Sequence, residues 1–415
     1  MTAPDTYQVI DAIWRIEQAK IIAGLTRLTR DVGAAEELAQ DALVAALKTW
    51  PERGIPDNPG AWLMATAKNR ALDASRRARL IEPKHEEIGR EMHQHETPDL
   101  DAALDDDIGD DLLRLMFTAC HPILSADARV ALTLRLIGGL TTDEIARAFL
   151  AAEPTIAQRI VRAKRTLAEA KVPFEVPRGA DRAGRLASVL EVMYLIFNEG
   201  YSATAGEDWV RPALCEEALR LGRILAELAT NEGEVHGLVA LMEIQASRLK
   251  ARIGANGEPI LLLEQNRARW DQLLIRRGLA ALARAQAQGP LGPYALQAAI
   301  AACHARARAA EDTDWPRIVS LYRQLAEITP SPVVELNLAV AVAMADGPEA
   351  GLARVDALAD EPALKNYHLL PSVRGDLLKK LGRLDEARAE FERAAQLTQN
   401  ARERALLLGR VADAS

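Results

Sequence analysis

The sequence predicts an all-α protein, and three observations support this fold class. The length of 415 residues is enough for two or three domains with substantial cores, and the apolar content of 49% predicts a globular protein. Aromatic residues make up only 4%, runs of β-branched residues are few, and the dominant residues Ala, Leu and Arg favour helices. The apolar residues also recur near the 3.6-residue period of amphipathic helices. We therefore expect helices along the whole globular chain.

Cysteines and hydropathy indicate a soluble cytoplasmic protein. The three cysteines, Cys120, Cys215 and Cys303, lie far apart and form no CxxC pair. This usage fits a reducing compartment and argues against a disulfide framework or a metal site. No signal peptide is recognisable at the N-terminus. The longest apolar stretch, residues 189–197, contains Glu191 and is too short to cross a bilayer.

The charge distribution divides the chain. Lys and Arg number 11 against 10 Asp and Glu in residues 1–80, 2 against 12 in residues 81–111, and 9 against 6 in residues 112–176. The middle segment also contains Pro83 and Pro98, so we expect a solvated acidic linker over 81–111. Helical domains are predicted over 1–80, 112–172 and 173–415. Because the net charge is −8, the chain alone should bind duplex DNA poorly and contact DNA within a larger complex.

The first predicted helix with a distinctive surface covers residues 31–47. It separates an apolar stripe from an acidic face. The pattern fits either an ordinary solvated helix face or a docking face for a basic partner. The stripe contains Ala35, Leu38, Ala39, Ala42, Leu43, Ala46 and Leu47, and the polar face contains Glu36, Glu37, Gln40 and Asp41.

The next helix, within residues 58–77, combines aromatic, amide and cationic side chains. These groups are suited to single-stranded DNA, because they can stack on unpaired bases, bond to base edges and follow the phosphates. Trp62 fits the core at least as well, and Asp73 can orient Arg76 or Arg77 as a helix pair. The set contains Trp62, Lys68, Asn69, Arg70, Asp73, Arg76 and Arg77, with Arg79 nearby.

Residues 140–170 predict a helix, a short turn and a second, basic helix. Thr141 and Thr142 precede Asp143 and Glu144, as expected at a helix start. The second helix opens near Pro154, and a helix-turn-helix would place it in the major groove. A plain amphipathic hairpin fits the spacing equally well. The apolar positions are Leu140, Ile145, Ala146, Phe149, Ile156, Ile160 and Leu167, and the second helix presents Gln158, Arg159, Arg162, Lys164 and Arg165.

The C-terminal part has the character of helical repeats. Residues 367–400 carry small or apolar residues where two antiparallel helices approach closely, as in a tetratricopeptide (TPR) repeat. A weaker copy covers residues 332–364, and residues 315–330 resemble the second helix of a third. Residues 345–349 are either an exposed contact loop or a turn between repeats. The strongest repeat contains Leu377, Gly382, Ala387, Phe391 and Ala394, and the weaker one Ala339, Ala343 and Gly351.

The order of these motifs over residues 7–172 resembles the extracytoplasmic-function (ECF) sigma factors of bacterial RNA polymerase. The resemblance implies that residues 1–80 are region 2, which binds the β′ clamp helices and the promoter −10 element. It implies that residues 112–172 are region 4, which binds the β flap and reads the −35 element. Asp31, Glu36, Glu37, Leu38 and Asp41 match the polymerase-binding helix, and residues 53–77, with Trp62 to Arg77, match the −10 element reader.

By the same resemblance, Ala157 and Gln158 would meet base edges of the −35 element. Arg159, Arg162 and Arg165 would meet phosphates, and Thr155 and Lys164 complete the set. The acidic linker would follow the path near the RNA exit channel or act as a passive tether. We expect no metal at His85, His93 and His95, and a structural role for Cys120 and His121.

Residues 173–415 resemble the extension of a TPR-like subgroup of these factors, including Asn198–Ser202 and Leu263–Asp271. The resemblance implies that the extension modulates activity in place of a membrane anti-sigma factor, with a small YCII-type protein as candidate partner. We find no phosphate loop, catalytic triad or cofactor motif, so we expect no enzyme activity and no cofactor. The alternatives are a stand-alone helix-turn-helix regulator with a TPR sensor, and a TPR scaffold with a non-functional sigma module.

Overall fold

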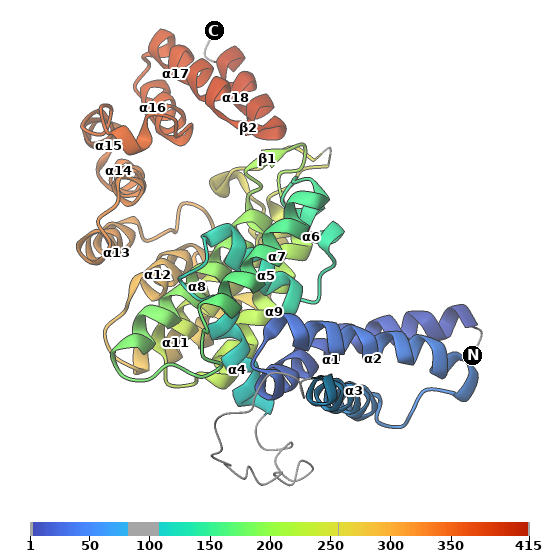
Figure 1. Ribbon diagram of the computed structural model, residues 1–415. Helices are drawn as coiled ribbons and strands as arrows, with labels where there is room; N and C mark the ends of the chain where they lie inside the picture. The colour runs from blue at the N-terminus through green and yellow to red at the C-terminus, as the bar shows by residue number, and fades with distance from the viewer. Residues whose placement is uncertain (1–2, 82–107, 256, 414–415) are drawn as a thin grey trace. The chain divides into compact units, whose positions relative to one another are not determined.

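The computed structural model describes residues 3–81, 108–255 and 257–413. Within these ranges it contains 18 α-helices and one pair of two-residue strands, which confirms the all-α prediction (Figure 1). The chain forms two compact units, residues 1–192 and 193–415, and helix α8 (Ala180–Tyr201) has residues in both. None of the described helices is both long and apolar enough to cross a membrane.

The N-terminal unit begins with three long helices that pack against one another. The side chain of Asp31 accepts hydrogen bonds from the backbone N–H groups of Gly33 and Ala34 and so caps the second helix. Trp50 and Leu63 are fully buried in this bundle. The helices are α1 (Ala3–Thr29), α2 (Val32–Arg53) and α3 (Pro59–Ile81).

Helix α4 (Ile108–Ala119) begins inside the segment that we expected to be a solvated linker. Asp111 is buried there and lies 2.6 Å from Arg114 Nη1 and 3.4 Å from Arg27 Nε. The two cations explain the difference, because they allow a carboxylate from the acidic segment to pack at the contact of α4 with α1. The rest of the predicted linker, including His85, His93 and His95, lies outside the described residues.

The predicted helix-turn-helix is present. Thr141 and Glu144 form a capping box at the start of α6 (Thr142–Ala148), and the second helix, α7, covers Glu153–Glu169. Both pack on α5 (Ala126–Leu136). Of the predicted apolar positions, Leu140 and Phe149 are only half-buried, while the other five are buried: Ile145, Ala146, Ile156, Ile160 and Leu167.

The first half of α8 belongs to the N-terminal unit. Its Ser188 hydroxyl donates to the carbonyl of Cys120 at 2.6 Å, and Arg185 donates to the carbonyl of Phe117 at 2.9 Å. Arg129 from α5 reaches both Ser188 and Glu191, the latter at 2.9 Å. The compact unit therefore extends about 20 residues beyond position 172, where we placed the end of the second domain.

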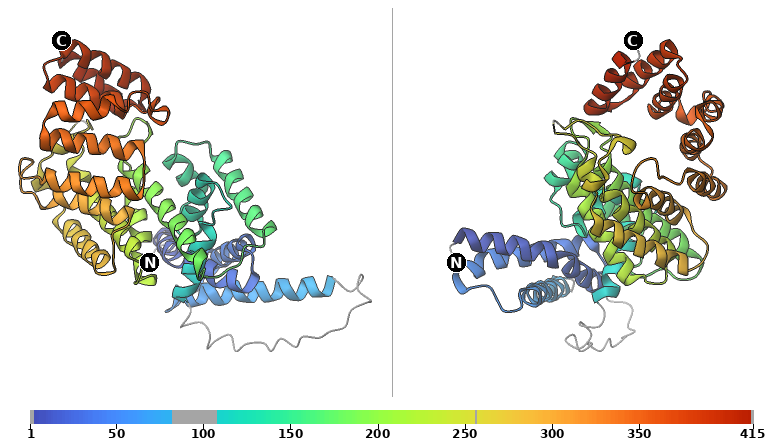
Figure 2. Two further views of the ribbon diagram at one scale, coloured as in Figure 1. Left: turned by 90° about the vertical axis from the view of Figure 1, so that its left-hand side faces the viewer. Right: turned by 180° about the vertical axis from the view of Figure 1, so that it is seen from behind.

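The C-terminal unit is built from pairs of successive helices (Figure 2). Between α10 and α11, three single turns of 3₁₀ helix interrupt the series. The α-helices are α9 (Pro212–Leu228), α10 (Gly233–Ala246), α11 (Gln272–Ala287), α12 (Pro293–Arg306), α13 (Trp315–Ile328), α14 (Pro332–Asp346), α15 (Pro348–Asp356), α16 (Leu369–Lys380), α17 (Leu384–Leu397) and α18 (Ala401–Asp413).

The two segments that we interpreted as repeats form the helix pairs α14–α15 and α16–α17. Gly351 permits the close approach of the first pair, because a Cβ there would lie 2.4 Å from that of Ala343. Phe391 is fully buried in the second pair. Gly382 and Gly347 instead have φ of +76° and +104° between helices, and in the 345–349 segment Gly347 alone separates α14 from α15.

A parallel strand pair, which we did not predict, connects the two ends of the C-terminal unit. β1 (Ala205–Gly206) pairs with β2 (Gln399–Asn400), as the adjacent labels in Figure 1 show. Asn400 is buried, and its amide donates to the carbonyls of Ala203 and Asp208 at 3.1 and 2.8 Å. Its side-chain oxygen also accepts from the backbone at the start of α18.

Candidate nucleic-acid and polymerase interface

The exposed face of α7 is the first part of the candidate site. Thr155, Gln158, Val161, Arg162 and Arg165 are exposed along it at helical spacing. Arg162 makes no ion pair with any residue that the structure describes. We missed Val161, whose exposed fraction is 64%, although an apolar residue within a basic helix face was visible in the sequence.

The other predicted −35 residues are more constrained. Arg159 pairs with Asp127 of α5 at 3.2 Å, and Arg165 pairs with Glu169 at 2.6 Å, which raises the pKa of its guanidinium. Lys164 forms an ion pair with Glu36 of α2, and both Lys164 and Ala157 are half-buried. Helix α7 therefore presents a narrower basic face than its composition suggests.

The predicted −10 residues lie on α3. Trp62 is half-buried and packs edge-to-face on Trp50, with ring centroids 5.3 Å apart, so it serves at least partly as core. Arg70 lies 3.1 Å from Asp41 of α2. Asn69 and Asp73 are exposed and Lys68 is half-buried. The backbones of Arg76 and Arg77 belong to α3, and their side chains lie outside the described set.

The residues of the predicted polymerase-binding face of α2 differ in their exposure to solvent. Glu37 and Asp41 are exposed, Leu38 is half-buried, and Asp31 caps the helix. Glu36 differs from our expectation of a surface acid, because its side chain is only 6% exposed. Two of the four carboxylates are therefore exposed, and one of these, Asp41, already pairs with Arg70 of α3.

Cations of the second helical segment explain the burial of Glu36. Arg135 Nε of α5 lies 2.7 Å from its Oε1, and the ammonium of Lys164 meets its Oε2. Gln18 of α1 donates to the Arg135 carbonyl at 3.1 Å, and Arg15 lies 3.2 Å from Glu144. These bonds connect α1 and α2 with α5, α6 and α7 within the N-terminal unit.

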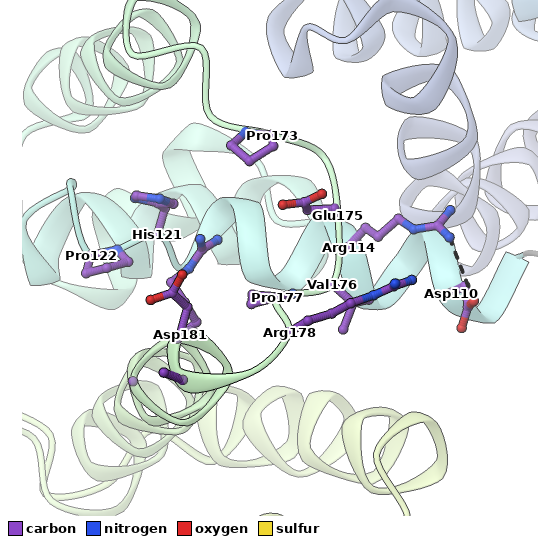
Figure 3. A pocket seen from close by; sticks show the side chains of 13 residues that line it. Asp110, Arg114, His121, Pro122, Pro173, Glu175, Val176, Pro177, Arg178 and Asp181 are labelled. Carbon is purple, nitrogen blue, oxygen red and sulfur yellow. Dashed lines mark ion pairs between the residues drawn. The ribbon is translucent and has the colours of Figure 1, made fainter.

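A groove of about 1090 Å³ lies where α4 faces the segment leading into α8 (Figure 3). Its walls carry both signs of charge, with Arg114 and Arg178 near Asp110 and Asp181. Arg114 Nη2 and Asp110 Oδ2 are 3.8 Å apart, the ion pair dashed in Figure 3. Because the charges largely balance, the groove lacks the single-sign surface that nucleic acid requires.

Burial and local hydrogen bonds give Cys120 and His121 the surroundings of residues with a structural role. Burial raises the pKa of the Cys120 thiol to about 11, and its sulfur lies 3.3 Å from the Thr133 hydroxyl. Such a thiol is a poor nucleophile at neutral pH. His121 Nδ1 accepts from the backbone N–H of Ile123 at 3.1 Å, and burial lowers its pKa. In the described ranges no group of His, Cys, Asp and Glu has the arrangement of a metal site.

Comparison with known proteins assigns these segments. Residues 14–81 match the family described as Sigma-70 region 2, and residues 114–167 match Sigma-70, region 4. Residues 185–286 match a family of unknown function, DUF6596. An uncharacterized protein of Rhizobium meliloti (strain 1021) is 45% identical over 387 residues, which cover 93% of this chain and 91% of that protein.

The matched segments coincide with the helices described above. Region 2 covers most of α1 and all of α2 and α3, whereas region 4 covers the second half of α4, all of α5 and α6 and most of α7, including the helix-turn-helix. Such domains bind core RNA polymerase and promoter DNA. The chain therefore belongs to the sigma-70 family, as a transcription initiation factor of the ECF type with a helical C-terminal extension.

Proposed function

We propose that α7 reads the −35 element, α3 captures unpaired −10 bases, and α2 docks on the β′ clamp helices while region 4 contacts the β flap. The observation that supports this assignment best is the exposed face of α7 in a helix-turn-helix. It combines Gln158, an amide suited to base edges, with Val161, an apolar contact for a thymine methyl group, and Arg162, an exposed cation for phosphate.

Two variants of α7 distinguish base reading from phosphate contact. Gln158→Ala should weaken promoter binding by the holoenzyme by about 1–3 kcal/mol and relax the preference at one −35 base pair. Arg162→Ala should weaken binding to all sequences alike and reduce the slope of log affinity against log salt by about 1. Arg276→Ala, an exposed arginine of α11, is the control for net charge. If neither α7 variant differs from this control, the assignment is wrong.

In the free chain, region 4 occupies part of the surface that we assign to polymerase. Glu36 pairs with Arg135 and Lys164, so the clamp helices and region 4 would compete for the same carboxylate. We propose that docking on polymerase exchanges these partners and releases Lys164 toward DNA. Arg135→Met should then strengthen polymerase binding, and an unchanged or weaker affinity for core enzyme would contradict the exchange.

We further propose that the C-terminal unit modulates the sigma regions and that the chain acts in the cytoplasm without enzymatic activity of its own. A truncation test should end at residue 192, because Ser188 and Glu191 satisfy Arg129 in the N-terminal unit. Equal transcription by residues 1–192 and the full chain would reject modulation. The YCII-type partner stays a prediction of the resemblance, testable by titrating such a protein into the full chain.

A further inference from the structure

The C-terminal unit contains a cavity of about 400 Å³ that the assignments above leave without a role. Side chains from α10, α12, α13 and α14 line it together with Arg248, which follows α10. The volume falls within the range of small-molecule sites in proteins. Apolar wall residues include Leu241, Ile300 and Val334.

Arg248 is the central charge of this cavity. Its guanidinium carbon lies 5.7 Å from the ring centroid of Tyr201 and 5.8 Å from that of Trp270. It forms no ion pair with any residue in the described ranges, and its buried Nε has no hydrogen-bond partner. Contact with two aromatic rings stabilises a cation only partly, and no carboxylate among the described residues completes the compensation.

Two neighbouring arginines increase the positive charge around Arg248. Arg252 lies 3.8 Å above the Tyr201 ring and donates to the Tyr201 carbonyl. Arg267 donates to the carbonyls of His304 and Ala307. Neither has an acidic ion-pair partner among the described residues. Of the three arginines, Arg248 is the one that lines the cavity, so it is the one placed to meet a ligand there.

The remaining polar groups of the cavity are neutral. Burial, with the charges of Arg248 and Arg267, lowers the pKa of His304 to about 4, and burial raises that of Tyr322 to about 12. Both side chains are therefore uncharged at neutral pH. Gln245 and Asn337 add amide groups, and none of the Asp and Glu residues that the structure describes lines the cavity. The wall thus offers one positive charge, several hydrogen-bond donors and apolar surface.

We propose that this cavity binds a small organic anion, with a carboxylate on Arg248 and an apolar body against the aliphatic wall. Arg248 is half-buried and pairs with no carboxylate among the described residues, so a bound carboxylate would supply the missing charge in a bidentate geometry that guanidinium groups favour. The donors of the amide and phenol groups can complete its hydrogen bonds. The inference concerns the C-terminal unit alone and holds whether or not the sigma assignments are correct.

Calorimetric titration of the full chain tests the proposal with 2-naphthoate and its neutral analogue 2-naphthamide. We expect a Kd for naphthoate of about 1 mM or lower, and binding of naphthamide at least about tenfold weaker. Arg248→Gln should weaken naphthoate binding at least about tenfold, whereas the exposed control Arg276→Gln should not. Equal binding of the two probes, or no binding of naphthoate at about 10 mM, would overturn the proposal. A chain that binds inorganic phosphate but does not bind naphthoate would also overturn the proposal.

Two further measurements separate a binding role of Arg248 from a structural one. Removing an uncompensated cation should leave the melting temperature of the free protein unchanged or raise it, while a purely structural arginine would make Arg248→Gln less stable. Naphthoate should also raise the pKa of His304, followed by NMR, because a nearby anion favours imidazolium. Naphthoate binding that leaves the His304 resonance unshifted would place the probe elsewhere and overturn the assignment.

Discussion

Glu36→Ala should loosen the attachment of α2 to α5 and α7. Removing one partner of a buried ion pair costs about 3–5 kcal/mol when the remaining charge is left without solvent. Here Arg135 and Lys164 keep 23% and 21% of their side-chain surface exposed, so water can solvate them after the substitution. We therefore expect a loss of about 2–3 kcal/mol. Glu37→Ala, at the exposed neighbour, should change stability by less than about 0.5 kcal/mol.

Hydrogen exchange of the full chain is the appropriate assay, because two compact units need not unfold in one transition. Amides of α2 and α7 should lose protection in Glu36→Ala and keep it in Glu37→Ala. Combining Glu36→Ala with Lys164→Met should cost less than the sum of the two changes, with a coupling of about 1–2 kcal/mol. Equal protection in Glu36→Ala and Glu37→Ala would refute the role of the ion pairs.

Three further predictions concern the C-terminal unit. Asn400→Ala should destabilise the C-terminal unit by about 2–3 kcal/mol in urea unfolding, because two hydrogen bonds to carbonyls and the cap of α18 are lost. A loss of less than about 1 kcal/mol would contradict this role of Asn400. The pKa of His304 is about 4 in the folded protein, so the folded state binds fewer protons than the unfolded state between about pH 4 and 6.5. Lowering the pH to 5 should therefore reduce the free energy of unfolding by about 2 kcal/mol. His304→Gln should abolish this part of the pH dependence. Phe391→Ala should cost about 3–5 kcal/mol by leaving a cavity between α16 and α17, and a melting temperature equal to that of the wild type would argue against this packing.

Features determined by neighbours in sequence were predictable. The capping box of Thr141 and Glu144, the apolar period of α7 and Pro154 near the start of α7 depend on interactions over a few residues. The order of the region 2 and region 4 motifs, supported later by the family matches, then identified the family. Local patterning also predicted that Ala387 and Phe391 are buried between antiparallel helices.

Features that depend on distant partners could not be predicted. Glu36 and Lys164 are 128 positions apart, and nothing in the acidic pattern of α2 distinguishes Glu36 from the exposed Glu37. In the sequence, Asp111 does not differ from the other acidic residues of the predicted linker, and its partner Arg27 is 84 positions away. Asn400 has its two carbonyl partners almost 200 residues earlier, and a two-residue strand is too short to leave a periodic signal.

Run-off transcription with purified core RNA polymerase tests the central assignment most directly. The template is the DNA upstream of the protein's own gene, and the wild-type chain is compared with Arg162→Ala and the control Arg276→Ala. We predict a discrete transcript only when chain and core enzyme are both present, reduced by Arg162→Ala and unchanged by Arg276→Ala. Tight binding of the chain alone to duplex DNA, with no transcript in the presence of core enzyme, would contradict the assignment and indicate a stand-alone regulator.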